Sequence, residues 1–186
     1  SEFSLFDPKF LEEVANMKAK NLAVELLKKL IAEQVSVYRR MNLVKSEKFS
    51  EIIQSAMNRY LNGMLTNEEV IEELLKLAKD IAAANAEGEA LGLNAEELAF
   101  YDALTKPQAV KDFYEHEELI AITKELTDLL RKNRTIDWQK KESARAGMRK
   151  LVKRLLKRHK YPPEGMDDAV QTVIGQCEMW TDNIFR

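Results

Sequence analysis

The chain has 186 residues, of which 45% are hydrophobic and 32% are charged, a composition typical of a folded domain with a buried core. No apolar run approaches the roughly 18 to 20 residues of a membrane helix, so we expect no membrane contact and a cytoplasmic location. The single cysteine, Cys177, excludes an internal disulfide and a multi-cysteine metal site. The chain begins Ser1-Glu2-Phe3, and we expect residues 1–3 to be a cloning scar ahead of a domain at 4–186.

Helix is predicted almost throughout. Glycine and proline are rare, with six and four residues, whereas the strong helix formers Leu, Ala, Glu and Lys dominate. We therefore predict an all-α fold of about six to eight helices, in one lobe or two. If there are two, we expect a first lobe at 8–104, a connector at 105–117 and a second lobe at 118–184.

The first predicted helix opens at Asp7-Pro8, an N-cap followed by proline at the first helical position. Nothing in the following sequence is a strong helix breaker, so this helix is expected to run unbroken to about Met41. A second helix is expected from Ser46 to Gly63, because glycine commonly ends a helix.

Two capping boxes mark further helix starts. Thr66 is followed three residues later by Glu69, and Asn94 by Glu97. In such a box, the capping side chain and the glutamate each accept a backbone N–H of the other residue. We predict one helix after each box and, between them, a turn where Gly88 and Gly92 interrupt the helical pattern.

A strongly basic stretch follows. Residues 131–160 hold 13 Lys or Arg against two acids, in a chain whose formal net charge is -2. A helical period predicts an apolar arc from Ala144 to Leu155 opposite a basic face. Asp137 or Thr135 is expected to cap this helix, and Tyr161-Pro162-Pro163 to stop it, before a last helix from about Asp167 or Asp168. The basic face consists of Arg145, Arg149, Lys150, Lys153, Arg154, Lys157 and Arg158.

Three interpretations of the basic face are open. In the first, the face is solvated or is paired within the fold with acids such as Glu115, Glu117 and Glu118. In the second, it binds the phosphate backbone of a nucleic acid, for which a basic helical stripe is the usual footprint. In the third, it binds an acidic protein partner. The face has no row of Asn or Gln suited to reading bases, so any contact with DNA is expected to be to the backbone.

Signs of catalysis are weak. No glycine-rich phosphate loop of the type G-x-x-x-x-G-K-[ST] occurs, so ATP binding by that route is not expected. His116 and His159 lie far apart in the sequence, and HEELI at 116–120 lacks the second histidine of a zinc-binding helix. We expect no catalytic residue, no cofactor and no metal site in this chain.

The run RKNRTIDWQKKESARAGMRKLVKRLLKRHKYPP, preceded by LGLNAEELAFYDALT and NGMLTNEEVIEELLKLAKDI, closely resembles the C-terminal helical region of the restriction, or motor, subunit of type I restriction-modification enzymes. The resemblance covers roughly residues 8–180. Its most specific parts include Thr135-Ile136-Asp137-Trp138 and Tyr161-Pro162-Pro163, which we expect to be structural and to position the basic helix.

The resemblance implies that the whole subunit carries a nuclease domain and two motor lobes that translocate DNA with ATP and Mg. The catalytic motifs of those parts have no matching positions here. It also implies that the C-terminal region helps to dock the motor subunit onto the methyltransferase and specificity subunits. The leading expectation is therefore a non-catalytic assembly domain whose basic helix faces DNA or an acidic partner surface. The first alternative is a module that binds the backbone of double-stranded DNA and guides the translocated duplex. The second is an enzyme whose site lies between the lobes, which would require a concave cluster of carboxylates with shifted pKa values.

Overall fold

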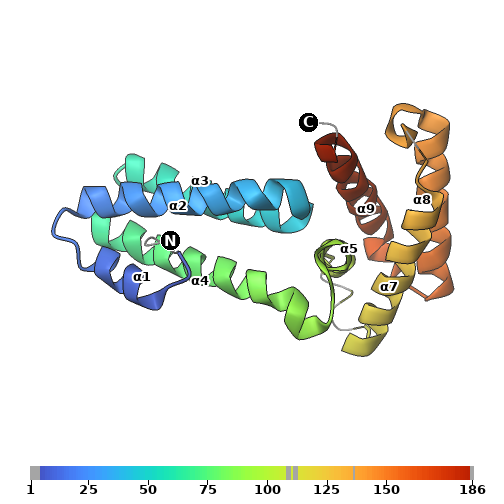
Figure 1. Cartoon of the computed structure of the whole chain (residues 1–186), viewed down its shortest axis with the longest axis horizontal. Coiled ribbons are helices and arrows are strands. Elements are labelled where there is room, and N and C mark those ends of the chain that lie inside the picture. The colour runs from blue at the N-terminus through green and yellow to red at the C-terminus, as the bar shows by residue number, and fades with distance from the viewer. Residues whose placement is uncertain (1–4, 108–109, 111–112, 136, 185–186) are drawn as a thin grey trace. The chain divides into compact units, whose positions relative to one another are not determined.

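A computed structural model describes residues 5–107, 110, 113–135 and 137–184 of the chain. Over these residues it contains eight α-helices, one short 3-10 helix and no strand, which confirms the predicted all-α class (Figure 1). The described helices form two compact units. The first unit extends to Gly88 except for residues 40–44, and the second consists of those five residues and the chain from Glu89 onward.

The first unit is built from four helices, shown in blue to green in Figure 1. They are α1 (Pro8–Ala15), α2 (Lys20–Met41), α3 (Leu43–Leu61) and α4 (Asn67–Leu91), although the last residues of α2 and α4 and the first two of α3 belong to the second unit. Their facing sides bury an apolar core, because Leu, Ile, Val and Phe recur at helical spacing. The core includes Val24, Leu27, Ile31, Phe49, Val70, Leu74, Leu77 and Ile81.

The start of α1 is as predicted, but its length is not. The backbone N–H of Lys9 donates to Asp7 Oδ1 at 3.0 Å, so Asp7 is the N-cap. The expected unbroken helix to Met41 is wrong, because α1 ends at Ala15 and α2 begins only at Lys20. The Lys20 ammonium group donates to the Ala15 carbonyl at 2.7 Å, which satisfies a terminal carbonyl at the break.

The next two helices follow the local signals closely at their starts, but the expected interruption at Gly88 is wrong, because α4 continues through it to Leu91. Helix α3 begins at Leu43, three residues before the expected Ser46, and Gly63 follows its end with a left-handed φ of +75°. The box at the start of α4 is formed, because Glu69 N–H donates to Thr66 Oγ1 at 3.1 Å and Thr66 N–H to Glu69 Oε1 at 3.0 Å. The bond from the Thr66 backbone N–H to the carboxylate is the main cause that lowers the pKa of Glu69.

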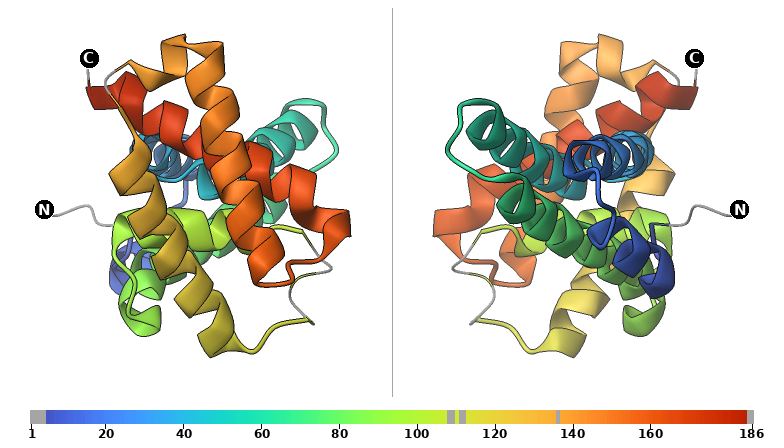
Figure 2. Two further views of the ribbon diagram at one scale, coloured as in Figure 1. Left: turned by 90° about the vertical axis from the view of Figure 1, so that its right-hand side faces the viewer. Right: turned by 90° about the vertical axis from the view of Figure 1, so that its left-hand side faces the viewer.

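The second unit contains α5 (Ala95–Thr105), α7 (His116–Asn133), the 3-10 helix η1 (Trp138–Lys140), α8 (Glu142–Arg158) and α9 (Pro163–Ile184). Figure 2 shows α7 in gold, α8 in orange and α9 in red. Asn94 and Glu97 form the predicted capping box of α5. The predicted lobes placed α5 with the preceding helices, whereas its apolar residues lie in the core of the second unit. That core includes Phe100, Leu104, Leu126, Leu130, Val152, Leu155, Leu156 and Val173.

A polar contact fixes the junction of α2 and α3 inside the second unit. The side chain of Gln176, on α9, accepts the Leu43 N–H at 2.7 Å and donates to the Met41 carbonyl at 3.1 Å. Trp180 Nε1 donates to the same carbonyl at 3.0 Å. Gln176 is almost fully buried, so these bonds satisfy groups that water cannot reach.

The turn between α8 and α9 differs from the predicted one. Helix α8 ends before the prolines, because Lys160 adopts a left-handed φ of +59°. The Tyr161 N–H then donates to the Leu156 carbonyl at 2.9 Å, as in a Schellman motif. Pro163 is the first residue of α9, so the expected start near Asp167 is wrong. Proline suits this position because its missing N–H would have no partner in a first helical turn.

Candidate interaction surface on α8

Helix α8 separates apolar from charged side chains, as predicted. Its buried side consists of Met148, Val152, Leu155 and Leu156, which pack in the core of the second unit. No side chain caps its start, so the expected cap by Asp137 or Thr135 is wrong. Asp137 instead opens the 3-10 helix with a left-handed φ of +59°. The remaining side of α8 carries the basic residues.

Two of the basic residues are tied to an acid at the start of their own helix. Glu142 accepts hydrogen bonds from Arg145 and Arg149, each at 2.5 Å. The bond from Arg145 is the main cause that lowers the pKa of Glu142, and the bond from Arg149 adds to it. Arg145 also lies 3.9 Å from Glu178 of α9. These two arginines are therefore partly neutralised within the fold.

A third basic residue is tied to α7. Arg158 donates to Glu125 Oε1 at 2.5 Å, and His159 Nε2 lies 2.6 Å from Oε2 of the same carboxylate. The contacts join the C-terminal end of α8 to the middle of α7. The acids expected to pair with the basic face, at 115–118, form no ion pair with it in the part of the chain that the structure describes.

Four basic residues of the face remain. Lys153 lies near Asp167 of α9, whereas Lys150, Arg154 and Lys157 are exposed and have no carboxylate within 4.0 Å among the described residues. At 100° per residue they fall within an arc of about 60° on α8. Like charges three or four residues apart repel by about 0.2 to 0.5 kcal/mol per pair, so this arc, which we call the cationic arc, favours an external anion.

A groove lies beside the cationic arc, between α8 and α9. It has a volume of about 560 Å³ and is bounded by charged residues of opposite sign. Lys153 Nζ lies 3.9 Å from Asp167 Oδ1 across it, and the Asp167 side chain is 97% exposed. The lining residues are Ala146, Arg149, Lys150, Lys153, Asp167, Val170 and Gln171.

The aromatic residues of the two sequence motifs face inward. Trp138 is buried, and its Nε1 donates to Thr181 Oγ1 at 3.2 Å. Tyr161 is buried as well, and its hydroxyl donates to the Leu104 carbonyl at 2.6 Å. Burial raises the pKa of Tyr161 well above its ordinary value. These bonds attach both ends of the α8 segment to other parts of the second unit.

The remaining residues of the two motifs are Thr135, Ile136, Pro162 and Pro163. The Thr135 carbonyl accepts the Trp138 N–H at 3.3 Å, while the Thr135 residue is exposed. Pro162 is buried and Pro163 is exposed at the start of α9. Ile136 lies outside the described residues.

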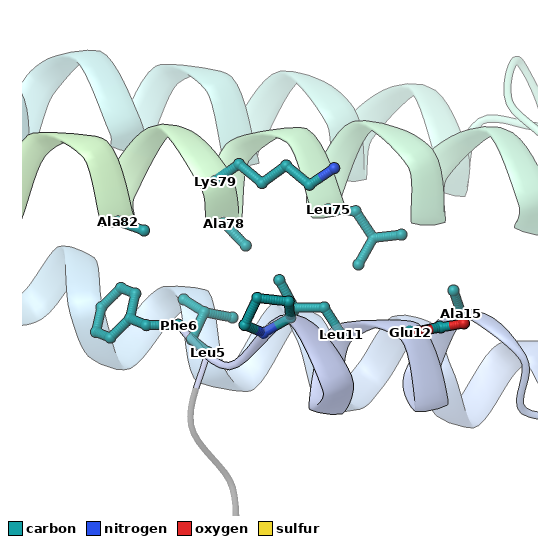
Figure 3. Close-up of a pocket in the computed structure, with 10 residues that line it drawn as sticks. Leu5, Phe6, Leu11, Glu12, Ala15, Leu75, Ala78, Lys79 and Ala82 are labelled. Atoms are coloured by element: carbon teal, nitrogen blue, oxygen red, sulfur yellow. The ribbon is translucent and has the colours of Figure 1, made fainter.

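A second groove, in the first unit, has a different chemistry. It lies between α1 and α4, has a volume of about 360 Å³ and is lined mainly by apolar side chains (Figure 3). Phe6, Leu11 and Ala78 lie along it, and Glu12 and Lys79 are the charged residues of its lining. The groove presents hydrophobic surface and does not belong to the charged site on α8.

Among the described residues, no three His, Cys, Asp or Glu side chains come together in a way that could hold a metal ion. No helix over those residues is long and apolar enough to cross a membrane. His116 contacts Tyr101, whereas His159 contacts Glu125, so the two histidines have separate partners.

Several residues of the site were missed in the sequence. Glu142 stands three and seven residues before its arginine partners, so a search for acids at helical spacing could have found it. Asp167 and Gln171 reach the groove from α9, and no local signal connects them with α8. Their role depends on how the two helices pack.

Comparison with known proteins places the chain in one family. Residues 1–183 match the family described as type I restriction enzyme HindI endonuclease subunit-like, C-terminal. The chain is 42% identical over 177 residues to the type I restriction enzyme HindI endonuclease subunit of Haemophilus influenzae, covering 95% of this chain and 17% of that protein. It is 32% identical over 156 residues to the putative type I restriction enzyme MjaIXP endonuclease subunit of Methanocaldococcus jannaschii, covering 83% of this chain and 15% of that protein.

The chain thus spans about a sixth of the length of these relatives. No solved structure matches it. The matched residues include both sequence motifs, the basic helix and the capping boxes of α4 and α5. The chain belongs to the family of C-terminal domains of HindI-like type I restriction endonuclease subunits.

Proposed function

We propose that this chain is a non-catalytic assembly domain, which docks a type I restriction subunit onto its methyltransferase and specificity partners in the cytoplasm. The ATP, the Mg and the catalytic groups of the longer subunit would then lie outside this chain. Family membership supports the role as part of such a subunit.

The cationic arc is the observation that carries the proposal. Lys150, Arg154 and Lys157 are exposed and lack an acid partner among the described residues, whereas Arg145, Arg149 and Arg158 are held by Glu142 and Glu125. A fold that only needed a solvated helix face would gain nothing from three adjacent repelling cations. Complementary charges across an interface speed association and fix its register, so an acidic partner surface explains the arc.

A competition experiment tests this function. The methyltransferase–specificity complex is mixed with the intact restriction subunit, and the chain is added in increasing amounts. An assembly domain displaces the intact subunit, and the displacement is followed by size-exclusion chromatography. If the intact subunit stays bound at a large excess of folded chain, the docking function is wrong.

The backbone of double-stranded DNA is a second candidate partner, favoured by the same arc. The cationic arc and Lys153 together could neutralise three to four phosphates. A plot of the logarithm of the binding constant against the logarithm of the salt concentration would then have a slope of about -3. The measurement is a salt series with a non-specific duplex. Binding that is absent at low salt removes this candidate and leaves the protein partner.

A further inference from the structure

We infer that the groove between α8 and α9 receives an amphipathic α-helix of the partner protein, with acidic residues turned toward α8. The inference rests on the proposed docking function and names the structural element that the groove would take. It concerns Ala146, Lys153, Asp167 and Val170, and does not depend on the cationic arc alone.

The two walls of the groove differ in charge. The α8 wall carries Arg149, Lys150 and Lys153, and the α9 wall carries Asp167 and Gln171. A nucleic acid backbone offers anionic oxygens to both walls and has no cation for Asp167, which is 97% exposed. A protein helix can place a carboxylate toward one wall and a donor toward the other, because residues three and four apart lie side by side.

The lining of the groove also includes apolar side chains. Ala146 of α8 and Val170 of α9 line it beside the charged residues, and Val170 is 7% exposed. A phosphate backbone has no apolar counterpart for these side chains, whereas an amphipathic helix presents an apolar stripe between its polar sides. The volume of about 560 Å³ lies within the range of ligand sites, about 300 to 1,000 Å³.

The ion pair between Lys153 and Asp167 is weak enough for a partner to replace it. Lys153 and Asp167 are 3.9 Å apart, at the limit of an ion pair, and both are well exposed. Exposed pairs of this kind contribute little to stability, so a carboxylate and a cation from a partner helix can replace each residue's present contact. The contact between Lys153 and Asp167 therefore does not oppose the binding of a helix in the groove.

Reversal of the groove's polarity tests the inference. The double variant Lys153→Asp/Asp167→Lys keeps the net charge and the possibility of an internal pair, but exchanges the charges of the two walls. The chain's affinity for the methyltransferase–specificity complex is measured by isothermal titration. We expect the affinity to fall by about tenfold, because each charge now meets its like. Ala146→Gln, which fills the groove with a neutral side chain, is expected to weaken binding as well.

A matched control is Asp128→Lys/Lys132→Asp, because this exposed pair on α7 does not line the groove. It should bind as the unaltered chain does. Equal binding by the unaltered chain, the groove swap and Ala146→Gln overturns the inference and leaves the docking function standing. If the groove variants instead weaken only binding to a DNA duplex, the occupant is nucleic acid and the inference is wrong. If the unaltered chain does not bind the complex, the docking function fails first, and the inference fails with it.

Discussion

Gly147 is a helical glycine that the fold does not require. It lies inside α8 with an ordinary helical backbone, and a Cβ placed on it meets nothing within 4 Å. Glycine in a helix interior is less favourable than alanine by about 0.5 to 1 kcal/mol, because it loses more backbone freedom on folding. We therefore expect Gly147→Ala to raise the free energy of unfolding by about that amount, measured by urea denaturation.

Gly92 provides the opposite case. It has a left-handed φ of +71°, which an L-residue with a Cβ adopts at a cost of about 1 to 2 kcal/mol. Gly92→Ala should therefore lower the free energy of unfolding although its Cβ also has open space. A loss of stability in Gly147→Ala similar to that in Gly92→Ala would contradict the open environment of Gly147.

Cys177 reports on the integrity of the second unit. Its side chain is fully buried, and burial raises the pKa of its thiol to about 12. The thiol is the unreactive form at neutral pH, so we expect a thiol reagent to label Cys177 only after unfolding. The labelling rate should rise in step with the loss of helical circular dichroism.

The raised pKa also has a consequence for stability. A thiol whose pKa is higher in the folded chain contributes stability that is fully present below its ordinary value of about 9 and is lost as the pH rises toward about 12.

Fast labelling of the folded chain at neutral pH would contradict the buried position of Cys177.

At the scale of single elements, α8 contains a carboxylate that titrates abnormally. Hydrogen bonds from Arg145 and then Arg149 lower the pKa of Glu142. Its contribution to stability is therefore present above the ordinary glutamate pKa and is lost as the pH falls through the lowered one. We expect an NMR titration of Glu142 to show this lowered pKa, and Arg145→Met to move it back toward the ordinary value.

Arg154 supplies the control for that titration. It has no ion pair among the described residues, so Arg154→Met should leave the pKa of Glu142 nearly unchanged. Equal titration curves for Glu142 in the unaltered chain and in Arg145→Met would show that the hydrogen bond does not set this pKa.

Helix starts with strong local signals could be predicted from the sequence. Asp7, Thr66 and Asn94 all cap the helices they were expected to cap, because these bonds involve residues at most three apart. The break after Ala15 could not be predicted, since residues 16–19 hold no proline or glycine. The start of α9 at Pro163 was missed because Pro162-Pro163 was interpreted only as the stop of the preceding helix, although proline is also common at the first helical position.

The candidate site was only partly predictable. The basic side of α8 follows from helical periodicity, so its residues could be named from the sequence. Which basic residues of α8 form ion pairs could not be predicted, because Glu125, Asp167 and Glu178 reach α8 from other helices. The groove likewise depends on the packing of α8 against α9, which no short-range pattern specifies.

At the scale of the whole molecule, charge is unevenly distributed along the chain. The formal net charge is -2, yet the segment 131–160 carries 13 basic residues against two acids. The positive electrostatic field of this segment speeds the encounter with an anionic partner. Near physiological salt, ions screen such a field over about 8 to 10 Å. We therefore expect the association rate with the methyltransferase–specificity complex to fall with salt more than the dissociation rate changes, measured by stopped-flow fluorescence. Rates that do not respond to salt would contradict electrostatic docking.

The most direct test of the docking function is a charge reversal on the cationic arc. The variant Lys150→Glu/Arg154→Glu/Lys157→Glu is compared with Lys28→Glu/Lys48→Glu/Lys76→Glu, which changes the net charge equally at exposed residues of the first unit. The affinity of each chain for the methyltransferase–specificity complex is measured by isothermal titration at one salt concentration. Docking through α8 predicts a loss of about tenfold or more for the arc variant and little change for the control. Equal affinities for the arc variant, the control and the unaltered chain would contradict it.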